Sequence, residues 1–381
     1  MSRKQVVLIE WIVLVLLAAG LIAFIVHALV SRGSGDRQEK AAVEASGTGT
    51  QNEDETEETV QEPEPTPTPD PERAYTLSFA GDCTIGSLIE WQGTQPGDFQ
   101  SVVGTDYAYP LSGVKTIFST DDLTVVNLEG TFTTAVNAVV KPYRFRADPA
   151  YAQVLTEGSV EAVSTSNNHS GDFLEQGLSD THSTLDNAGI LYTHAGTPLI
   201  RELDGGFKIG IVTYNTVENW EGLNVWYASV KTDIDACKAA NCDLIIGFMH
   251  WGTVEYLKEP EDWEVTFAHT MADWGCGLIV GGHAHILQRM EIYNDVPIFY
   301  SMGNFCYGGH LNPDDKDSVI VQAEFTRNAD TGEVRRTGLN VIPCLVSSRT
   351  DANNYCPTPC EKGGADYQRI IERLNWKGET T

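Results

Sequence analysis

The feature that most constrains this 381-residue chain is an apolar block near its N-terminus. The block runs from Val6 to Val30, and Glu10 and His27 are the only ionisable side chains among its 25 residues. A helix of that length exceeds the roughly 30 Å hydrocarbon core of a bilayer. A cleavable signal peptide has a shorter apolar region of about 7–15 residues, and a buried soluble helix fits poorly with the polar segment that follows. We therefore expect a single-pass transmembrane anchor at residues 6–30.

The segment at 31–73 is expected to be a disordered acidic and proline-rich linker. It contains an acidic run at 53–58 and alternating prolines at 63–71. Such a composition buries too little apolar surface to order itself, although an interaction tail is an alternative reading. Basic residues within 1–5 favour a short cytoplasmic segment there. The remainder of the chain would then be extracellular and tethered to the cell membrane.

The net charge limits the partners of the folded part. The whole chain has a net charge of −28, and the part from Ala74 onward has 40 acidic and 19 basic residues, a net −21. This excess argues against a nucleic-acid partner, because phosphates require a basic surface. It argues equally against flat docking on anionic lipid. A divalent cation, by contrast, would offset carboxylates gathered in one site.

Strand-like apolar runs alternate with helix-like stretches after the linker. Strands are expected at 75–80, 122–126, 160–165, 208–214, 242–249 and 278–280, a hairpin at 290–301, and helices at about 174–189 and 261–275. This alternation predicts an α/β domain with layered β-sheets flanked by helices. No P-loop, dinucleotide-binding glycine motif or serine nucleophile elbow is present in the sequence.

Polar side chains follow directly after the expected strands. They are Asp82, Glu129, Asn168, His169, His250, His283 and His285. Each has an ordinary structural alternative when taken alone, such as a turn, a helix cap or a core histidine. Because loops at the carboxyl ends of strands converge, we expect these groups in one crevice. Together their imidazole, amide and carboxylate donors suit Zn, Mn or Fe, and a metal pair is a common device for attack on a phosphoryl centre.

Several short motifs in a fixed order carry a family resemblance. They are Gly81-Asp82, Asn127-Leu128-Glu129-Gly130, Asn167-Asn168-His169-x-x-Asp172, His250-Trp251-Gly252-x-x-Glu255, Gly282-His283-Ala284-His285 and Gly303-Asn304-Phe305. This set resembles the CapA family of poly-γ-glutamate capsule biosynthesis proteins, which is similar in fold to calcineurin-like metallophosphoesterases. The resemblance implies a metallophosphoesterase-like domain at 74–345, followed by a C-terminal extension at 346–381.

The resemblance also implies a metal centre. One or two divalent ions would be held by an acid after the first strand, a bridging acid, an asparagine and three histidines. The implied ligands are Asp82, Glu129, Asn168, His250, His283 and His285. The mixed donor set favours Mn, Zn or Fe as the cofactor.

The same resemblance implies a candidate catalytic set. His169 would lie over the leaving group as a general acid, a role open to a histidine of near-neutral pKa. Asp172 lies three residues later in the same motif. Glu255 would be an extra ligand or a partner that orients His250.

Substrate contacts and departures from the pattern complete the site prediction. Arg144 and Arg146 are candidates to grip a phosphate or carboxylate, the alternative being ordinary surface arginines. Asn304 is a third candidate for substrate binding, or else a structural residue. Thr84 stands where metallophosphoesterases have a histidine ligand, and Glu129 replaces the usual bridging aspartate. These departures leave open whether one metal position is weak, altered or empty.

The eight cysteines allow local disulfides in an extracellular domain. Cys237 and Cys242 lie close in sequence, as do Cys356 and Cys360, so both pairs are candidate bridges. The spacing does not determine the connectivity.

Three functions remain open from the sequence. The first is a membrane-anchored protein acting in synthesis, export or anchoring of poly-γ-glutamate or a related polymer, with membrane-bound polymer synthase subunits as partners. The second is a metal-dependent phosphatase or phosphodiesterase acting on an extracellular phosphorylated substrate. The third is a non-catalytic subunit that binds an anionic polymer or a partner through a degenerate metal site. We favour an enzyme.

Overall fold

The computed structural model describes residues 72–217 and 222–378. The expected cytoplasmic segment at 1–5, the anchor at 6–30 and the linker up to residue 71 lie outside these residues. The end of the expected linker is already folded, because Glu72 and Arg73 begin the first strand. Within the described ranges, no helix has the length and apolar character needed to cross a membrane.

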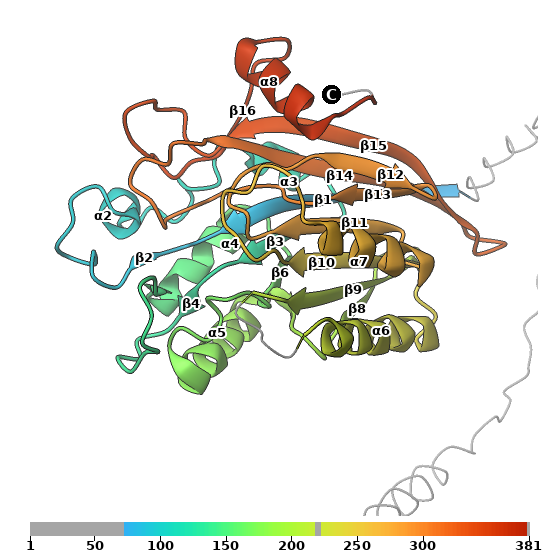
Figure 1. Cartoon of the computed structure of the whole chain (residues 1–381), viewed down its shortest axis with the longest axis horizontal. Helices are drawn as coiled ribbons and strands as arrows, with labels where there is room; N and C mark the ends of the chain where they lie inside the picture. Colours follow the sequence, from blue (N-terminus) through green and yellow to red (C-terminus); the bar gives the residue numbers. More distant parts are fainter. Residues whose placement is uncertain (1–71, 218–221, 379–381) are drawn as a thin grey trace, which may run out of the picture. The chain divides into compact units, whose positions relative to one another are not determined.

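The larger sheet has seven strands in the order β16-β15-β14-β1-β3-β6-β7 (Figure 1). Strands β1, β3, β6 and β7 are parallel, whereas β14, β15 and β16 extend the sheet in antiparallel fashion from β1. Their bounds are β1 Glu72–Cys83, β3 Leu123–Leu128, β6 Ala162–Ser164, β7 Leu191–Thr193, β14 Asp317–Asn328, β15 Val334–Leu345 and β16 Thr358–Pro359.

A second sheet has six strands in the order β12-β13-β11-β10-β9-β8. Its central strands β9, β10, β11 and β13 are parallel, and the edge strands β8 and β12 are antiparallel. The bounds are β8 Leu199–Glu202, β9 Lys208–Asn215, β10 Leu244–His250, β11 Leu278–Gly282, β12 Met290–Tyr293 and β13 Val296–Phe299. A small third sheet joins β2 Ser87–Leu88, β5 Phe145–Ala147 and β4 Thr131–Phe132.

Most helices cover the outer faces of the two large sheets, whereas the last helix packs onto the main core beside β14 and β15 (Figure 1). Their bounds are α2 Phe99–Val103, α3 Lys115–Phe118, α4 Gln153–Glu157, α5 Leu174–Ala188, α6 Leu223–Ala239, α7 Asp262–Asp273 and α8 Ala365–Leu374, with a 3₁₀ turn at Pro149–Ala152. The helix expected near 174–189 is confirmed as α5. Gly189 ends it with a φ of 71°, a left-handed conformation that glycine adopts without steric cost.

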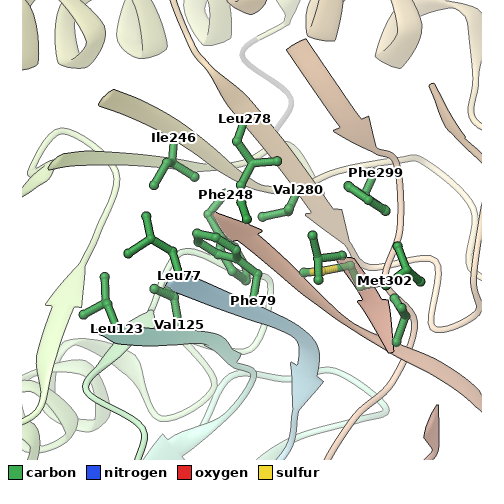
Figure 2. Packing of buried hydrophobic residues seen from close by; sticks show 14 of the residues in the cluster. Leu77, Phe79, Leu123, Val125, Ile246, Phe248, Leu278, Val280, Phe299 and Met302 are labelled. Carbon is green, nitrogen blue, oxygen red and sulfur yellow. The ribbon is translucent and has the colours of Figure 1, made fainter. Parts of the chain in front are cut away.

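The main core lies between the two large sheets (Figure 2). Leu77 and Phe79 of β1 point toward Ile246 and Phe248 of β10, and the two phenylalanine ring centroids are 6.4 Å apart. The alternate residues of the same strands face outward into the helical layers, where for example Met249 packs beneath α6 and α7. Central strands that are buried on both faces are continuously apolar. This explains why their apolar runs could be recognised in the sequence. The mixed α/β fold with layered sheets is therefore confirmed.

The two candidate disulfides are not formed, since all eight cysteines are free thiols. Cys356 and Cys360 have different neighbours. The Cys356 sulfur lies 3.5 Å from the hydroxyl of Ser112, whereas Cys360 packs against the main core. Strand β16 runs between these two cysteines and directs them to different parts of the molecule.

Candidate metal centre

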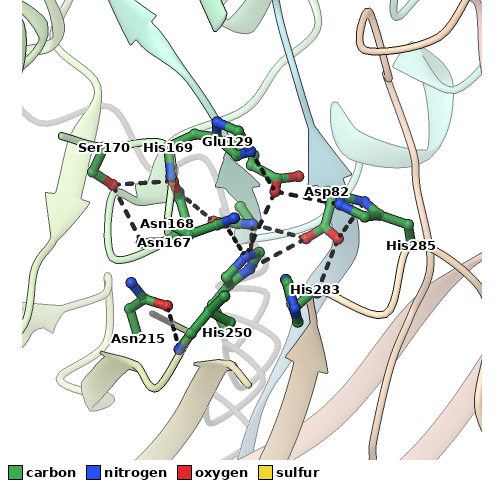
Figure 3. A network of polar contacts seen from close by, with 12 residues as sticks. Asp82, Glu129, Asn167, Asn168, His169, Ser170, Asn215, His250, His283 and His285 are labelled. Carbon is green, nitrogen blue, oxygen red and sulfur yellow. Dashed lines mark hydrogen bonds and ion pairs between the residues drawn. The ribbon is translucent and has the colours of Figure 1, made fainter. Parts of the chain in front are cut away.

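The centre lies where strands of both large sheets end. Asp82 is near the end of β1, Glu129 follows β3, His250 ends β10 and His283 follows β11. The two sheets pack with these ends at the same edge, so side chains far apart in sequence lie together (Figure 3). All four are buried, with exposed fractions between 0% and 3%. The expectation that strand-end loops converge is met for these side chains.

Asp82, Glu129 and His285 form a compact group of potential ligands. One donor atom from each lies within 4.8 Å of the other two. The His285 Nε2 atom is 3.7 Å from Glu129 Oε1, and its Nδ1 atom is 3.6 Å from Asp82 Oδ2. These separations are too long for hydrogen bonds. Because the two distances start from different ring nitrogens, one ion could take only one of them, and Nε2, which faces Glu129, is the nitrogen available to a metal.

Glu129 supplies the most informative observation at the site. Its Oε1 atom faces the Nε2 atoms of His250 at 3.6 Å, His285 at 3.7 Å and His169 at 4.0 Å. The carboxylate is fully buried, and neither oxygen accepts a hydrogen bond from any described residue. An ionised carboxylate without donors in the interior is costly. A shared cation would satisfy both oxygens, so the residues present fit a divalent metal ion.

Burial shifts the pKa values of the acids and the histidines in opposite directions. It raises the pKa of Asp82, and it raises the pKa of Glu129 further with help from the charge of Asp82. It lowers the pKa of His250 well below its usual value and the pKa of His283 to about 3. These imidazoles are therefore neutral at physiological pH, and the neutral form is the one that ligates metals.

His250 and Asn168 meet on the other side of Glu129. The His250 Nε2 atom lies 2.9 Å from Asn168 Oδ1, so both atoms face the same point as Glu129 Oε1. The His283 ring packs beside that of His250, with centroids 5.1 Å apart, and its Nδ1 atom has no hydrogen-bond partner among the described residues. Glu129, Asn168 and His250 thus lie together, whereas His283 is connected to them through its ring contact with His250.

The backbone of the His-x-His segment is held in an unusual conformation. His283 has a φ of 85° and His285 a φ of 57°. Residues other than glycine rarely adopt this backbone conformation. Asp82 helps to fix this turn by accepting a hydrogen bond of 3.1 Å from the His283 backbone N–H. Asn304 holds His285, because its Oδ1 lies 2.9 Å from Nδ1 and its amide donates to the His285 carbonyl oxygen. The two rings are thus positioned by contacts to both sheets.

His169 is oriented by a buried carboxylate. Asp172 Oδ2 lies 2.9 Å from His169 Nδ1 and also accepts a hydrogen bond from the Phe145 backbone N–H. Its other oxygen, Oδ1, is 2.7 Å from the Lys141 ammonium, which also donates to the carbonyl oxygen of Asn168. The contact at Nδ1 leaves Nε2 directed toward Glu129. Asp172 therefore acts through His169.

The residues predicted to bind substrate have contacts within the protein, and their role toward a substrate stays a prediction. Arg144 is ion-paired with Glu90, and Arg146 donates to the Ala135 carbonyl oxygen and packs over a phenylalanine ring. Both guanidinium groups thus have partners within the chain, and the pair of Arg144 with Glu90 lies at the surface. Asn304, expected at the substrate, instead contacts His285 at two points.

Glu255 and Thr84 also differ from the simplest reading of the pattern. Glu255 is exposed, and the two nitrogens of His250 lie against Asn127 and Asn168, so Glu255 does not orient that ring. Its charge nevertheless contributes to the raised pKa of Glu129. Thr84 is fully buried, and its hydroxyl has no hydrogen-bond partner in the described ranges.

Three contributors to the site were not assigned a role from the sequence. Asn127 donates to Asp82 Oδ1 at 2.8 Å, and Asn167 donates to Asn127 Oδ1 at 3.0 Å. Both asparagines belong to the motifs at the strand ends, and this position is the sequence feature that could have identified them as site residues. Lys141 lies a few residues before Arg144 and Arg146 in the chain. No local sequence pattern predicts its ion pair with Asp172.

Comparison with known proteins establishes the family. A family model described as bacterial capsule synthesis protein PGA_cap matches residues 76–308, which is more than half of the chain. This chain belongs to the PGA_cap family. The resemblance to CapA proteins drawn from the motifs is thereby confirmed.

Named relatives of this PGA_cap protein come from several bacteria. The PGA biosynthesis protein CapA of Bacillus subtilis is 26% identical over 325 residues, covering 79% of this chain and 80% of the relative. The capsule biosynthesis protein CapA of Bacillus anthracis is 27% identical, covering 53% of each chain. A probable polyglutamine synthesis accessory protein of Mycobacterium tuberculosis is 29% identical, covering 50% of this chain and 58% of the relative.

Two solved structures are similar to this PGA_cap protein at a TM-score of 0.43. One is a phosphatase from Mycoplasma pneumoniae, with 15% identity over 72% of this chain and 94% of the other. The other is a calcineurin-like phosphoesterase from Bacillus subtilis, with 13% identity over 79% of this chain and 97% of the other.

Proposed function

We propose that this protein acts in the synthesis, export or anchoring of poly-γ-glutamate or a related surface polymer, using a divalent-metal site of the metallophosphoesterase type. The observation that carries the proposal is the buried Glu129 carboxylate, which has no hydrogen-bond donor in the described chain and faces three imidazole nitrogens. Family membership supports the polymer, since two relatives are named as CapA proteins of PGA or capsule biosynthesis.

Two overlapping sets of residues would hold the metal. Asp82, Glu129 and His285 form one set. We assign Glu129, Asn168 and His250 to the other, with His283 as a further ligand from beside the His250 ring. Both sets combine carboxylate oxygen with imidazole nitrogen, which suits Mn, Zn or Fe. A divalent ion bound there supplies Lewis-acid charge for attack on a phosphoryl centre.

His169 would move the proton in such a reaction. Its Nδ1 atom is held by Asp172, so Nε2 is the atom that exchanges a proton with a leaving group. Asp172 keeps the imidazole in one orientation and stabilises the positive charge that it gains on protonation, whereas the Lys141 ammonium, which pairs with Asp172, opposes that charge. Burial lowers the pKa of His169, although the hydrogen bond to Asp172 opposes that shift.

The expected membrane anchor completes this proposal. A single-pass helix at residues 6–30 would keep the folded domain at the outer face of the cell membrane, where a surface polymer emerges. Membrane-bound subunits of a polymer synthase are the proposed partners. The relative from Mycobacterium tuberculosis is named as an accessory protein, which agrees with a role beside synthesis machinery.

A second candidate function is a non-catalytic subunit that binds polymer or partners. Thr84 favours it, because this residue replaces a histidine ligand of the metallophosphoesterase pattern and its buried hydroxyl has no partner in the described residues. The two functions differ in whether the purified protein turns over phosphoesters.

The first test is elemental analysis of the purified full-length chain, wild type beside Glu129→Gln and His283→Ala. We expect near-stoichiometric transition metal in the wild type and a more than tenfold lower metal content in each variant, because each loses a buried ligand. His310→Ala is the matched control, since His310 is exposed and away from the described ligands. Unchanged melting temperatures of metal-free variants would show that the fold is retained.

The outcomes separate the candidate functions. Bound metal with turnover of model phosphate esters that requires His169 supports the enzyme. Bound metal without turnover supports the binding subunit. Absence of metal from the wild type, even after reconstitution with Mn, Zn and Fe, would overturn the proposed centre.

A further inference from the structure

A groove lies far from the metal centre, between β12, β15 and the segment that follows α8. Its volume is about 580 Å³. The lining includes the apolar side chains of Ile292, Leu339 and Trp376 and the cationic side chains of Arg289, Arg336 and Lys377. Ile292 is a large apolar side chain left 51% exposed. The groove therefore combines apolar walls with cationic groups.

Two of these cations have no acidic partner in contact. The Nη1 atom of Arg336 is buried and has no hydrogen-bond partner among residues 72–217 and 222–378. Lys377 is exposed and forms no ion pair within the same ranges. Asp295, in the turn between β12 and β13, attracts the charge of Arg336 electrostatically, but it does not line the groove.

The acid in the groove wall is already neutralised. Glu291 lies 2.6 Å from His269 Nε2, accepts a hydrogen bond of 2.6 Å from the Tyr300 hydroxyl and faces Arg289 at 3.3 Å. These contacts also occupy Arg289, which packs over the Tyr300 ring. The uncompensated charge of the groove is thus positive and belongs to Arg336 and Lys377.

A positive groove is notable in this molecule because the chain carries a net charge of −28. An anionic polymer would be repelled by most of such a surface. Arg144 and Arg146, expected to grip an anionic substrate, are engaged within the protein. Charge complementarity therefore favours the groove as the place where an anionic chain can dock.

We infer that this groove binds a segment of a carboxylate-bearing polymer, namely a polyglutamate chain. Arg336 would engage one carboxylate through guanidinium nitrogens other than the buried Nη1, and Lys377 would engage a neighbouring one. Ile292, Leu339 and Trp376 would pack against the methylene groups between the carboxylates. The polymer's identity rests on the family membership and hence on the proposed function, but binding at the groove does not require the metal centre.

The strand register gives the distance between the two sites. Arg336 is paired with Phe325 on β14, which is paired with Tyr75 on β1. Asp82 lies seven residues further along β1, and at about 3.3 Å per residue this places the metal centre roughly 23 Å away. Substitutions in the groove should therefore leave the metal content unchanged.

The test is a binding titration of poly-γ-glutamate of defined length with the purified full-length chain at low salt. We expect Arg336→Gln and Lys377→Gln each to weaken binding about tenfold, and raised salt to weaken wild-type binding. Arg335→Gln is the matched control. Arg335 is the adjacent residue on the same strand, lies outside the groove lining and is paired with Glu72, and its substitution changes the net charge equally. Arg336→Lys should retain part of the affinity.

Several results would overturn the inference. One is equal binding by Arg336→Gln and Arg335→Gln, and another is no binding by the wild type. Stronger competition by inorganic polyphosphate than by polyglutamate would assign the groove to a phosphate polymer instead. Lys377→Gln tests the groove even where substitution inside β15 impairs folding. Normal metal content with lost polymer binding would count for the groove alone, whereas the reverse result would count for the metal centre alone.

Discussion

At the scale of single residues, the centre depends on contacts that hold its histidines in place. Asn304 contacts both the ring and the carbonyl oxygen of His285, whose backbone has a positive φ. Asn127 bridges Asp82 and His250. Such partners fix ring orientation and thereby affect how well a ligand set binds a metal.

Asn304→Ala should weaken metal binding without removing a ligand. Loss of an orienting partner lowers metal affinity by about 10–100-fold in comparable sites. The measurement is a competition titration of the purified full-length chain with a metal chelator. Asn340→Ala serves as the control, because Asn340 bonds to Glu324 on the sheet surface. Equal affinity in the two variants would show that Asn304 does not support the centre.

At the scale of elements, the ends of strands and helices carry the buried polar groups. Helix α7 begins with a capping box, in which Glu261 and Glu264 each accept a hydrogen bond from the other's backbone N–H. Glu264 is only 2% exposed, and burial raises its pKa to about 7. The helix therefore begins with an acid that is largely protonated in the folded state at mildly acidic pH.

This shift predicts a pH dependence of stability. Since its pKa is raised on folding, Glu264 contributes stability below the unfolded value of about 4.5 and loses it as pH rises through about 7. Replacing it in Glu264→Gln keeps an acceptor for the cap but removes the titration. The free energy of unfolding of the wild type, relative to this variant, should fall by roughly 2–3 kcal/mol between pH 4.5 and 8. Denaturant unfolding at several pH values measures this difference, and parallel pH curves for the two proteins would refute it.

At the scale of the whole molecule, the two sheets build the centre together. Asp82 and Glu129 come from the seven-stranded sheet, and His250 and His283 come from the six-stranded sheet. The side chains of Leu77, Phe79 and their neighbours fix how these sheets pack. The position of the ligands thus depends on the core between the sheets.

Phe79→Ala should destabilise the protein strongly. Phe79 is fully buried between the sheets and faces Phe248, so truncation leaves a cavity at the interface. Comparable substitutions cost about 3–5 kcal/mol. Tyr143→Ala, an aromatic residue that is 57% exposed, should cost less than about 0.5 kcal/mol. Similar unfolding midpoints for the two variants in urea would contradict the role assigned to the core.

Local patterns made much of the fold and several site residues predictable. Strands buried on both faces are continuous apolar runs, and the polar residues at their ends stand out against them. Asp82, Glu129, His250, His283 and His285 were chosen in this way, and the structure brings them together. The order of the motifs likewise indicated the family that the comparison confirmed.

By itself, the sequence determined the central strands, the polar groups at their ends and the family to which the chain belongs, but not the antiparallel strands β14 and β15. Only the tertiary structure decided the partners of those groups. Asp82 and His283 are in contact across 201 residues, Lys141 reaches Asp172, and the two candidate arginines are engaged elsewhere. The physical reason is that local patterns report burial and backbone conformation, whereas long-range side-chain contacts depend on how two sheets pack through their shared core.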